Sequence, residues 1–195
     1  MRQRLILCPP ADVPAETLAA VLRAGDVAAV VLAPLAPGLA ALVQAAQGEG
    51  VAALLAAQMA VDGKGWPALH GADGVHLTGA MEGRRLALEA RPEGVTVGAL
   101  ALDRHEAMVL GESGADYLWF GATGALEEDA VLRAAWWQSL FETPCVLAGP
   151  DTEDALSAMI ASEAEFLALD VFAAADPAER VALVDARLAP RAGRS

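Results

Sequence analysis

Short apolar runs recur along the chain, and they lack the polar alternation of strands that keep one face in water. Runs of this kind are typical of strands buried on both faces, as in a parallel sheet. The segments between them are long enough for helices, so strands and helices are expected to alternate. The predicted strands cover residues 5–8, 27–32, 52–56, 74–77, 95–98, 117–120, 145–148 and 166–169.

Several of the intervening segments begin with a residue that can cap a helix. Asp103 is followed three positions later by Glu106, which is the spacing of a capping box. Thr152 precedes two acidic residues, and Asp176 precedes a proline, which is favoured at the first helical position. The predicted helices cover residues 15–24, 38–48, 81–90, 103–113, 126–141, 152–162 and 177–188, with a short irregular helix over residues 66–70.

One heptapeptide, Gly-Ala-Asp-Gly-Val-His-Leu at residues 71–77, returns in altered form at residues 25–31, 114–120 and 162–168. Most copies place a small residue at a helix end, an acidic residue in the turn and then the start of a strand. Asp73 and Asp116 are therefore interpreted as structural turn formers. Two strand-helix units fit between successive copies, and four copies make the eight units of a closed (β/α)8 TIM barrel. An open doubly wound sheet is the alternative.

The composition indicates one domain that spans residues 1–195. Hydrophobic residues make up 55% of the chain and the mean hydropathy is +0.40, which excludes disorder. Apolar runs fall short of the roughly 18 residues that a membrane span needs, and the apolar start is too short for a signal peptide. We therefore expect a cytoplasmic protein with no membrane partner, and a loose C-terminal tail over residues 189–195.

The net charge and the few cysteine and histidine residues exclude further classes of function. The net charge of −13 argues against a nucleic-acid partner, because binding phosphate backbones requires basic patches. The cysteines, Cys8 and Cys145, are predicted to be buried free thiols. His70 is expected at a helix end, His76 within the scaffold and His105 in solvent. Their spacing is not that of metal ligands, so we expect no metal site.

These motifs give the chain a resemblance to the thiamine phosphate synthase family, including its TenI (thiazole tautomerase) branch. Residues 71–77 match the family run residue for residue, and residues 97–98, 113–117 and 144–149 follow its fifth, sixth and seventh units. The resemblance implies a TIM barrel of thiamine biosynthesis. Its synthases are transferases that join hydroxymethylpyrimidine diphosphate to thiazole phosphate with Mg²⁺. Such polyanionic ligands require cations, main-chain amides or a metal.

The loops that follow the strands form the site of such a barrel, and here they depart from the family pattern. Residues 33–37 are uncharged where the synthases have an arginine and a lysine. Leu102 stands where the tautomerase branch has a functional histidine. Pro150 and Asp151 replace part of a phosphate cradle, and Asp170 stands where the family has Ser-Gly. The resemblance therefore implies a degenerate active site.

The candidate catalytic residues are Asp62, Lys64 and Asp170. No cofactor is expected, and Mg²⁺ enters only if the family reaction is retained. The predicted ligand pocket consists of Gln58, Thr78, Leu102, Trp119, Gly121, Thr123 and Gly149.

Three functions stay open at this point. The chain is a thiamine phosphate synthase-type transferase, or a non-catalytic relative that binds an uncharged thiazole or pyrimidine or a partner protein, or a barrel with a different proton-transfer reaction. A homo-oligomer is a further alternative. Trp136 and Trp137 point about 100° apart on a helix. Either one of them is half exposed at a subunit interface, or both pack against neighbouring helices.

Overall fold

Eight parallel strands close into a barrel in the order β1-β2-β3-β4-β5-β6-β7-β8 in the computed structural model, which describes residues 2–188. The first and last strands pair directly, with Leu5 opposite Leu167, so the predicted barrel is confirmed and the open sheet is excluded. The predicted tail at residues 189–195 lies outside the described residues. The strands are β1 (Arg4–Leu7), β2 (Val27–Leu32), β3 (Ala52–Met59), β4 (Gly74–Gly79), β5 (Thr96–Leu100), β6 (Tyr117–Phe120), β7 (Cys145–Gly149) and β8 (Phe166–Leu169).

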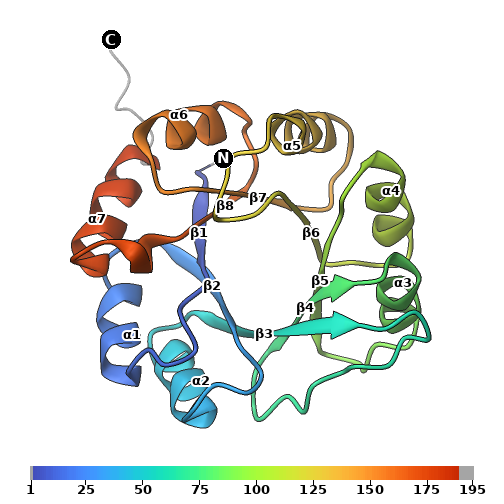
Figure 1. The fold of residues 1–195 in the computed structure, drawn as a ribbon, viewed down its shortest axis with the longest axis horizontal. Helices are drawn as coiled ribbons and strands as arrows, with labels where there is room; N and C mark the ends of the chain where they lie inside the picture. Colours follow the sequence, from blue (N-terminus) through green and yellow to red (C-terminus); the bar gives the residue numbers. More distant parts are fainter. Residues whose placement is uncertain (1, 189–195) are drawn as a thin grey trace.

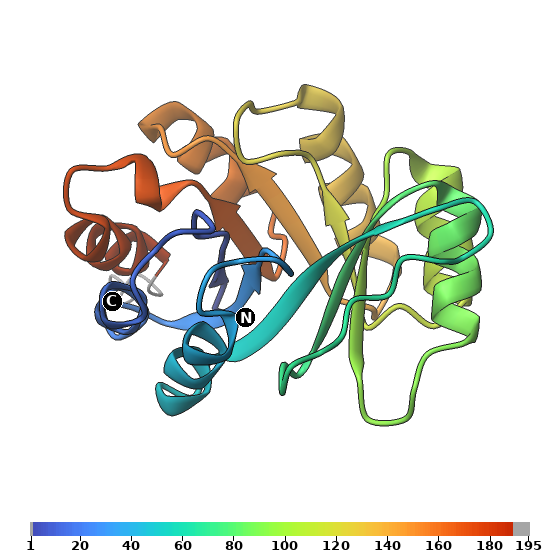
Figure 2. The ribbon, with the colours of Figure 1, turned by 60° about the horizontal axis from the view of Figure 1, so that its bottom comes forward.

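The helices surround the strands as an outer ring (Figures 1 and 2). This arrangement buries both faces of each strand, as the unbroken apolar runs predict. The helices are α1 (Ala15–Leu22), α2 (Leu39–Gly48), α3 (Met81–Glu89), α4 (Arg104–Glu112), α5 (Glu128–Leu140), α6 (Glu153–Ala161) and α7 (Pro177–Leu188), with a 3₁₀ turn, η1 (Val171–Ala173), after β8.

The connection between β3 and β4 contains no helix, so the helix predicted over residues 66–70 is wrong. Gly63 and Gly65 have positive φ angles of 75° and 121°, and His70 also adopts a positive φ of 49°. His70 cannot continue a right-handed helix in this conformation, and residues 64–69 are irregular. The loop still covers the barrel, because the partly buried Trp66 and Leu69 pack against the core where a helix would lie.

Side chains of each strand alternate between two cores. Leu5 and Leu7 lie between the strands and the helices, whereas Ile6 points into the barrel. Much of the barrel interior is filled by small residues such as Ala29 and Ala168, together with Tyr117, Trp119 and other larger side chains. The interior of the barrel is therefore a packed core.

Acidic residues in the repeated turns fasten neighbouring strands at the base of the barrel. The Asp73 carboxylate accepts a hydrogen bond from the Ala53 N–H at 2.8 Å, and the Asp116 carboxylate accepts one from the Val97 N–H at 2.7 Å. Each bond satisfies the N–H of the second residue of the neighbouring strand. The interpretation of Asp73 and Asp116 as structural turn formers is confirmed.

Tyr117 crosses the interior beside a glycine that has no room for a side chain. A Cβ atom added to Gly98 would lie 1.9 Å from the Tyr117 ring, so only glycine fits at this point of β5. The Tyr117 hydroxyl lies 3.2 Å from Nδ1 of His76 on β4. The neighbouring strands β4 and β5 thus accommodate the Tyr117 ring, which comes from β6.

The predicted helix starts are confirmed at three places. The Asp103 carboxylate accepts the Glu106 N–H at 2.8 Å, the Thr152 hydroxyl accepts the Ala155 N–H at 3.4 Å, and Asp176 accepts the Glu179 N–H at 3.0 Å. The Glu106 side chain returns to the N–H of Leu102, one residue before the position expected in a capping box. This second bond ties the β5–α4 loop to the helix.

The two adjacent tryptophans of α5 differ in burial. Trp137 is 1% exposed, donates Nε1–H to the Thr143 carbonyl at 2.7 Å and stacks on Phe141. Trp136 is partly buried, with the Arg104 guanidinium 4.8 Å from its ring centre. The inward packing of one tryptophan is thus confirmed, and a homo-oligomer interface stays a prediction. Within residues 2–188, no helix is long and apolar enough to cross a membrane.

Candidate functional site

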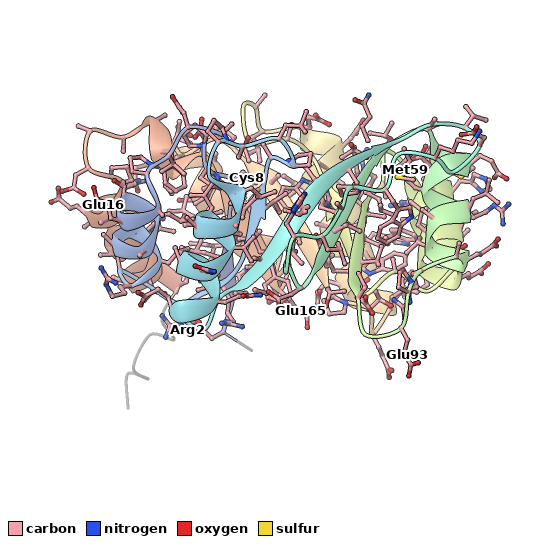
Figure 3. The ribbon with its side chains drawn as sticks, turned by 90° about the horizontal axis from the view of Figure 1, so that it is seen from below. Arg2, Cys8, Glu16, Met59, Glu93 and Glu165 are labelled. Carbon is pink, nitrogen blue, oxygen red and sulfur yellow. The ribbon has the colours of Figure 1, made fainter. Side chains whose placement is uncertain are left out.

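The carboxyl ends of the strands meet at one end of the barrel, which we call the mouth. In Figure 3, Cys8 and Met59 lie toward this end, and Arg2, Glu93 and Glu165 lie toward the opposite end. Loops at the mouth carry function in strand-helix barrels, because the strands hold them in fixed positions. Two cavities open among these loops.

The first, the β6 cavity, has a volume of about 480 Å³ and lies between the loops after β5 and β6 and the start of α5. Leu100, Leu102 and the Gly121-Ala122 backbone line one part of it. Its other lining residues are charged, namely Glu127, Glu128, Asp129 and Arg133. The predicted pocket residues Leu102 and Gly121 therefore lie together here.

The second, the β8 cavity, has a volume of about 460 Å³ and lies above β7 and β8. Thr123 and Asp170 lie together in its wall, beside Pro150. Arg180 of α7 donates to both carboxylate oxygens of Asp151, through Nε at 2.7 and 2.9 Å and through a terminal nitrogen at 2.6 Å. This pairing raises the pKa of Arg180, and it leaves the guanidinium neutralised by its partner.

Asp62 and Lys64 form their own ion pair in the β3–β4 loop. The Lys64 ammonium lies 2.8 Å from the Asp62 carboxylate, and both side chains are largely exposed. The lysine hydrogen bond lowers the pKa of Asp62. Neither residue lines the β6 or β8 cavity, so the structure places these two candidates apart from Asp170.

The other predicted pocket residues are distributed over the strand ends. Gln58 is exposed, and the Thr78 hydroxyl lies 3.4 Å from the Ala57 carbonyl oxygen. Trp119 is 5% exposed and donates its Nε1–H to the Gly121 carbonyl at 3.1 Å. Gly149 is buried against Met159.

Beneath the mouth, the barrel interior holds His76, Tyr117 and Trp119. The His76 and Tyr117 rings are stacked, with centroids 5.9 Å apart, and the Trp119 ring lies 4.7 Å from His76. Burial, followed by the charge of Arg84, lowers the pKa of His76 to about 4. Burial also raises the pKa of Tyr117. Both rings are therefore neutral near pH 7.

The two cysteines are free thiols, as predicted. Cys145 is buried and Cys8 is partly buried just beyond the end of β1. Burial raises the pKa of each thiol to about 12, and for Cys8 the charge of Asp170 adds to this effect. A thiol of this kind is a poor nucleophile, because the thiolate is the reactive form.

Acidic residues in the segments after β3 and β4 have cationic partners. Asp62 pairs with Lys64, and Glu82 accepts two hydrogen bonds from Arg85 at 2.6 and 2.9 Å. Within the described part of the chain, no three His, Cys, Asp or Glu side chains lie together as metal ligands would. The carboxylates of Asp62 and Glu82 are thus engaged by Lys64 and Arg85.

The sequence did not identify two arginines that lie at the mouth. Arg133 lies on α5 and Arg180 on α7, and neither was among the predicted site residues. The partner of Arg180, Asp151, lies 29 positions away, so no local spacing indicates the contact. A surplus of arginine over lysine is visible in the composition, but it does not identify which arginines reach the mouth.

Two comparisons at the sequence level agree on one family. A family model described as thiamine monophosphate synthase matches residues 14–170. The chain is 38% identical over 184 residues to the thiamine-phosphate synthase of Rhodospirillum centenum, covering 84% of this chain and 85% of that protein. It is 33% identical over 187 residues to that of Hyphomonas neptunium, covering 86% and 84%.

Among solved structures, the thiamine phosphate pyrophosphorylase from Pyrococcus furiosus superposes with a TM-score of 0.73, covering 97% of this chain and 98% of that chain. The sequence identity of this pair is 19%, so the comparison supports the fold and carries no conclusion about function.

Proposed function

Because the chain belongs to the thiamine monophosphate synthase family, we propose that it serves thiamine biosynthesis by binding an uncharged thiazole or pyrimidine at the barrel mouth. In this proposal it does not join hydroxymethylpyrimidine diphosphate to thiazole phosphate. The family and the fold are established by the comparisons and the closed barrel. The proposal concerns the ligand and the loss of the transferase reaction.

The balance of charge at the mouth is the observation that carries this proposal. The β6 cavity is lined by three carboxylates and one guanidinium, and the β8 cavity by two carboxylates and one guanidinium. Lys64, the only lysine, is paired with Asp62. A diphosphate would add negative charge to cavities that already carry an excess of it, and like charges in close contact repel.

The main chain offers little compensation above β7 and β8. Pro150 has no N–H to donate to a phosphate, and the next residue is the negatively charged Asp151. Asp62 and Glu82, which follow β3 and β4, are paired with Lys64 and Arg85. These features argue against a tightly held polyanion above β7 and β8.

A neutral heterocycle fits the mouth better. Its rim exposes apolar side chains, with Leu35 93% exposed, Val61 68% exposed and Leu102 58% exposed. The neutral His76 and Tyr117 lie below. Apolar surfaces with a few polar groups are typical of small-molecule sites.

The test uses the purified full chain, hydroxymethylpyrimidine diphosphate, thiazole phosphate and Mg²⁺, with thiamine phosphate measured by mass spectrometry. We expect no product at high protein concentration. In a parallel thermal-shift series, the unphosphorylated thiazole and pyrimidine should raise the melting temperature, because a ligand bound only to the folded state stabilises it. Stabilisation by the phosphorylated ligands alone would contradict the proposal.

The second candidate is a retained transferase reaction. The 38% identity to the Rhodospirillum centenum thiamine-phosphate synthase favours it. Product that increases linearly with protein concentration and requires the full-length folded chain would establish this candidate and exclude the first.

A further inference from the structure

We propose that the outer face of α4 and α5 is the interface through which two copies of this chain form a dimer, with like helices antiparallel across a two-fold axis. The inference is independent of the proposed ligand, because this face belongs to the outside of the helix ring (Figure 1). It rests on an exposed apolar stripe, on two exposed charges without partners and on the order of both along the helices.

Large apolar side chains gather on the solvent side of α5. Leu132 is 57% exposed and Leu140 is 66% exposed, and the partly buried Trp136 lies midway between them in the sequence. Residues four apart share one side of a helix, so the three side chains form a stripe. Exposed apolar patches of this kind mark interaction surfaces, where aromatic residues are enriched.

The neighbouring helix α4 continues this apolar surface. Its Met108 is 42% exposed. The Arg104 guanidinium lies 4.8 Å from the centre of the Trp136 ring, and a Cβ atom added to Gly111 would lie 2.8 Å from the Trp137 ring. Because Arg104 and Gly111 flank Met108 along α4, Met108 lies at about the level of Trp136. One patch therefore spans both helices.

Two exposed charges lie at the ends of the same side of α4. Arg104 is the first residue of the helix and Glu112 is the last, each four positions from Met108. Both side chains are exposed, and among residues 2–188 neither has an ion-pair partner. When two α4 helices pack antiparallel around Met108, Arg104 of one copy faces Glu112 of the other, and symmetry provides this pair twice.

The stripe on α5 has the same order. In an antiparallel arrangement centred on Trp136, Leu132 of one copy faces Leu140 of the other, again twice. A two-fold axis perpendicular to the helices, at the common level of Met108 and Trp136, satisfies both helices at once. This matching in both directions is a requirement of a surface that pairs with itself, whereas a different partner protein does not need it.

The charge of the chain also favours this face for self-association. Two copies with a net charge of −13 repel each other, so the contact needs attraction between the facing surfaces. On α3, by contrast, Arg85 is already paired with acidic residues of its own helix. The carboxylates at the ends of α5, Glu128, Asp129 and Glu142, lie beyond the apolar stripe, at the rim, where interfaces are polar and solvated.

The test measures the mass of the full chain by sedimentation equilibrium at about 1 to 200 µM protein. Salt at about 0.15 M screens the long-range repulsion between copies. We expect the mass to rise from 20.0 kDa toward twice this value. Leu132→Asp should raise the dissociation constant at least roughly tenfold. Leu183→Asp, a matched change at a leucine of α7 that is 54% exposed, should leave it unchanged.

A charge exchange tests the antiparallel order itself. Arg104→Glu and Glu112→Arg should each weaken the dimer several-fold, because each places like charges opposite one another. The double variant should return to within about twofold of the wild type, since the pair is restored with its signs reversed. Both changes put an acid at the start of α4 or a base at its end, which suits the helix dipole, so unfolding does not account for a loss.

Three results would overturn the inference. The first is a wild-type chain that stays monomeric at the highest concentration. The second is a Leu132→Asp variant that dimerises as tightly as the Leu183→Asp variant. The third is a double charge variant that dimerises no more tightly than the two single variants.

Discussion

At the scale of single residues, His76 shows how the barrel interior controls protonation. The residue belongs to the heptapeptide that repeats along the sequence, yet its pKa depends mainly on how deeply the fold buries it. It is 6% exposed, and its Nδ1 lies 3.2 Å from the Tyr117 hydroxyl. Burial penalises the charged imidazolium, with the nearby Arg84 adding to the effect, so the neutral ring is the stable form.

The lowered pKa of His76 predicts that the folded protein loses stability in acid. The pKa is near 6.5 in an unfolded chain and about 4 in the folded protein. Between these values the unfolded state binds more protons, so stability falls as the pH drops from about 6.5 toward 4. The shift corresponds to a loss of about 3 kcal/mol when complete.

The measurement compares urea unfolding of the wild type and His76→Gln at several pH values in this window. The difference between the two proteins isolates His76 from the carboxylates, which titrate in both. Parallel curves across the whole window would show that His76 does not contribute.

At the scale of elements, a buried ion pair joins α3 and α4, which lie side by side in Figure 1. Arg84 of α3 is 1% exposed, donates to the Glu106 carboxylate of α4 at 3.0 Å and also to the Leu100 carbonyl. Glu106 in turn accepts the Leu102 N–H at 2.9 Å. These bonds hold the β5–α4 loop, which supplies the apolar wall of the β6 cavity.

Two neighbouring arginines of α3 provide a matched test. Arg84→Met leaves Glu106 without its partner and removes two buried hydrogen bonds, so we expect a loss of about 3 kcal/mol in the free energy of unfolding. Arg85→Met breaks only pairs with Glu82 and Glu89 on the helix surface, and the expected loss is below about 1 kcal/mol. Equal losses in denaturant unfolding would show that the buried pair has no special role.

At the scale of the whole molecule, repulsion among the excess carboxylates opposes folding into the compact barrel. The chain carries a net charge of −13, and folding concentrates its carboxylates on a compact surface. Ion pairs such as Arg4–Asp26 and Arg91–Asp116 offset part of this repulsion at the base. Added salt screens the repulsion over distances longer than about 10 Å, while contact pairs are affected less.

We therefore expect the melting temperature to rise as sodium chloride is increased from low to moderate concentration. The physical reason is that long-range repulsion among the excess carboxylates is weakened more than the short ion pairs are. Calorimetry at fixed pH measures this effect. A melting temperature that falls steadily with salt would mean that the ion pairs outweigh the repulsion.

The amino-acid pattern was sufficient for the strands, most helices, the caps and the closure into eight units, because these features depend on local periodicity and on a repeated turn. The segment at residues 66–70 is the exception. Its apolar residues suggested a helix, but the positive φ angles at Gly65 and His70 and the packing of Trp66 on the core favour a loop.

The electrostatics of the mouth required the folded chain. Asp151 and Arg180 are 29 positions apart, and Arg84 and Glu106 are 22 apart. Their contacts arise because the closed barrel brings the starts of different helices and loops together at one end. The sequence shows which charged residues are present. Long-range packing decides that Arg180 pairs closely with Asp151 and that Arg133 makes no hydrogen bond among residues 2–188.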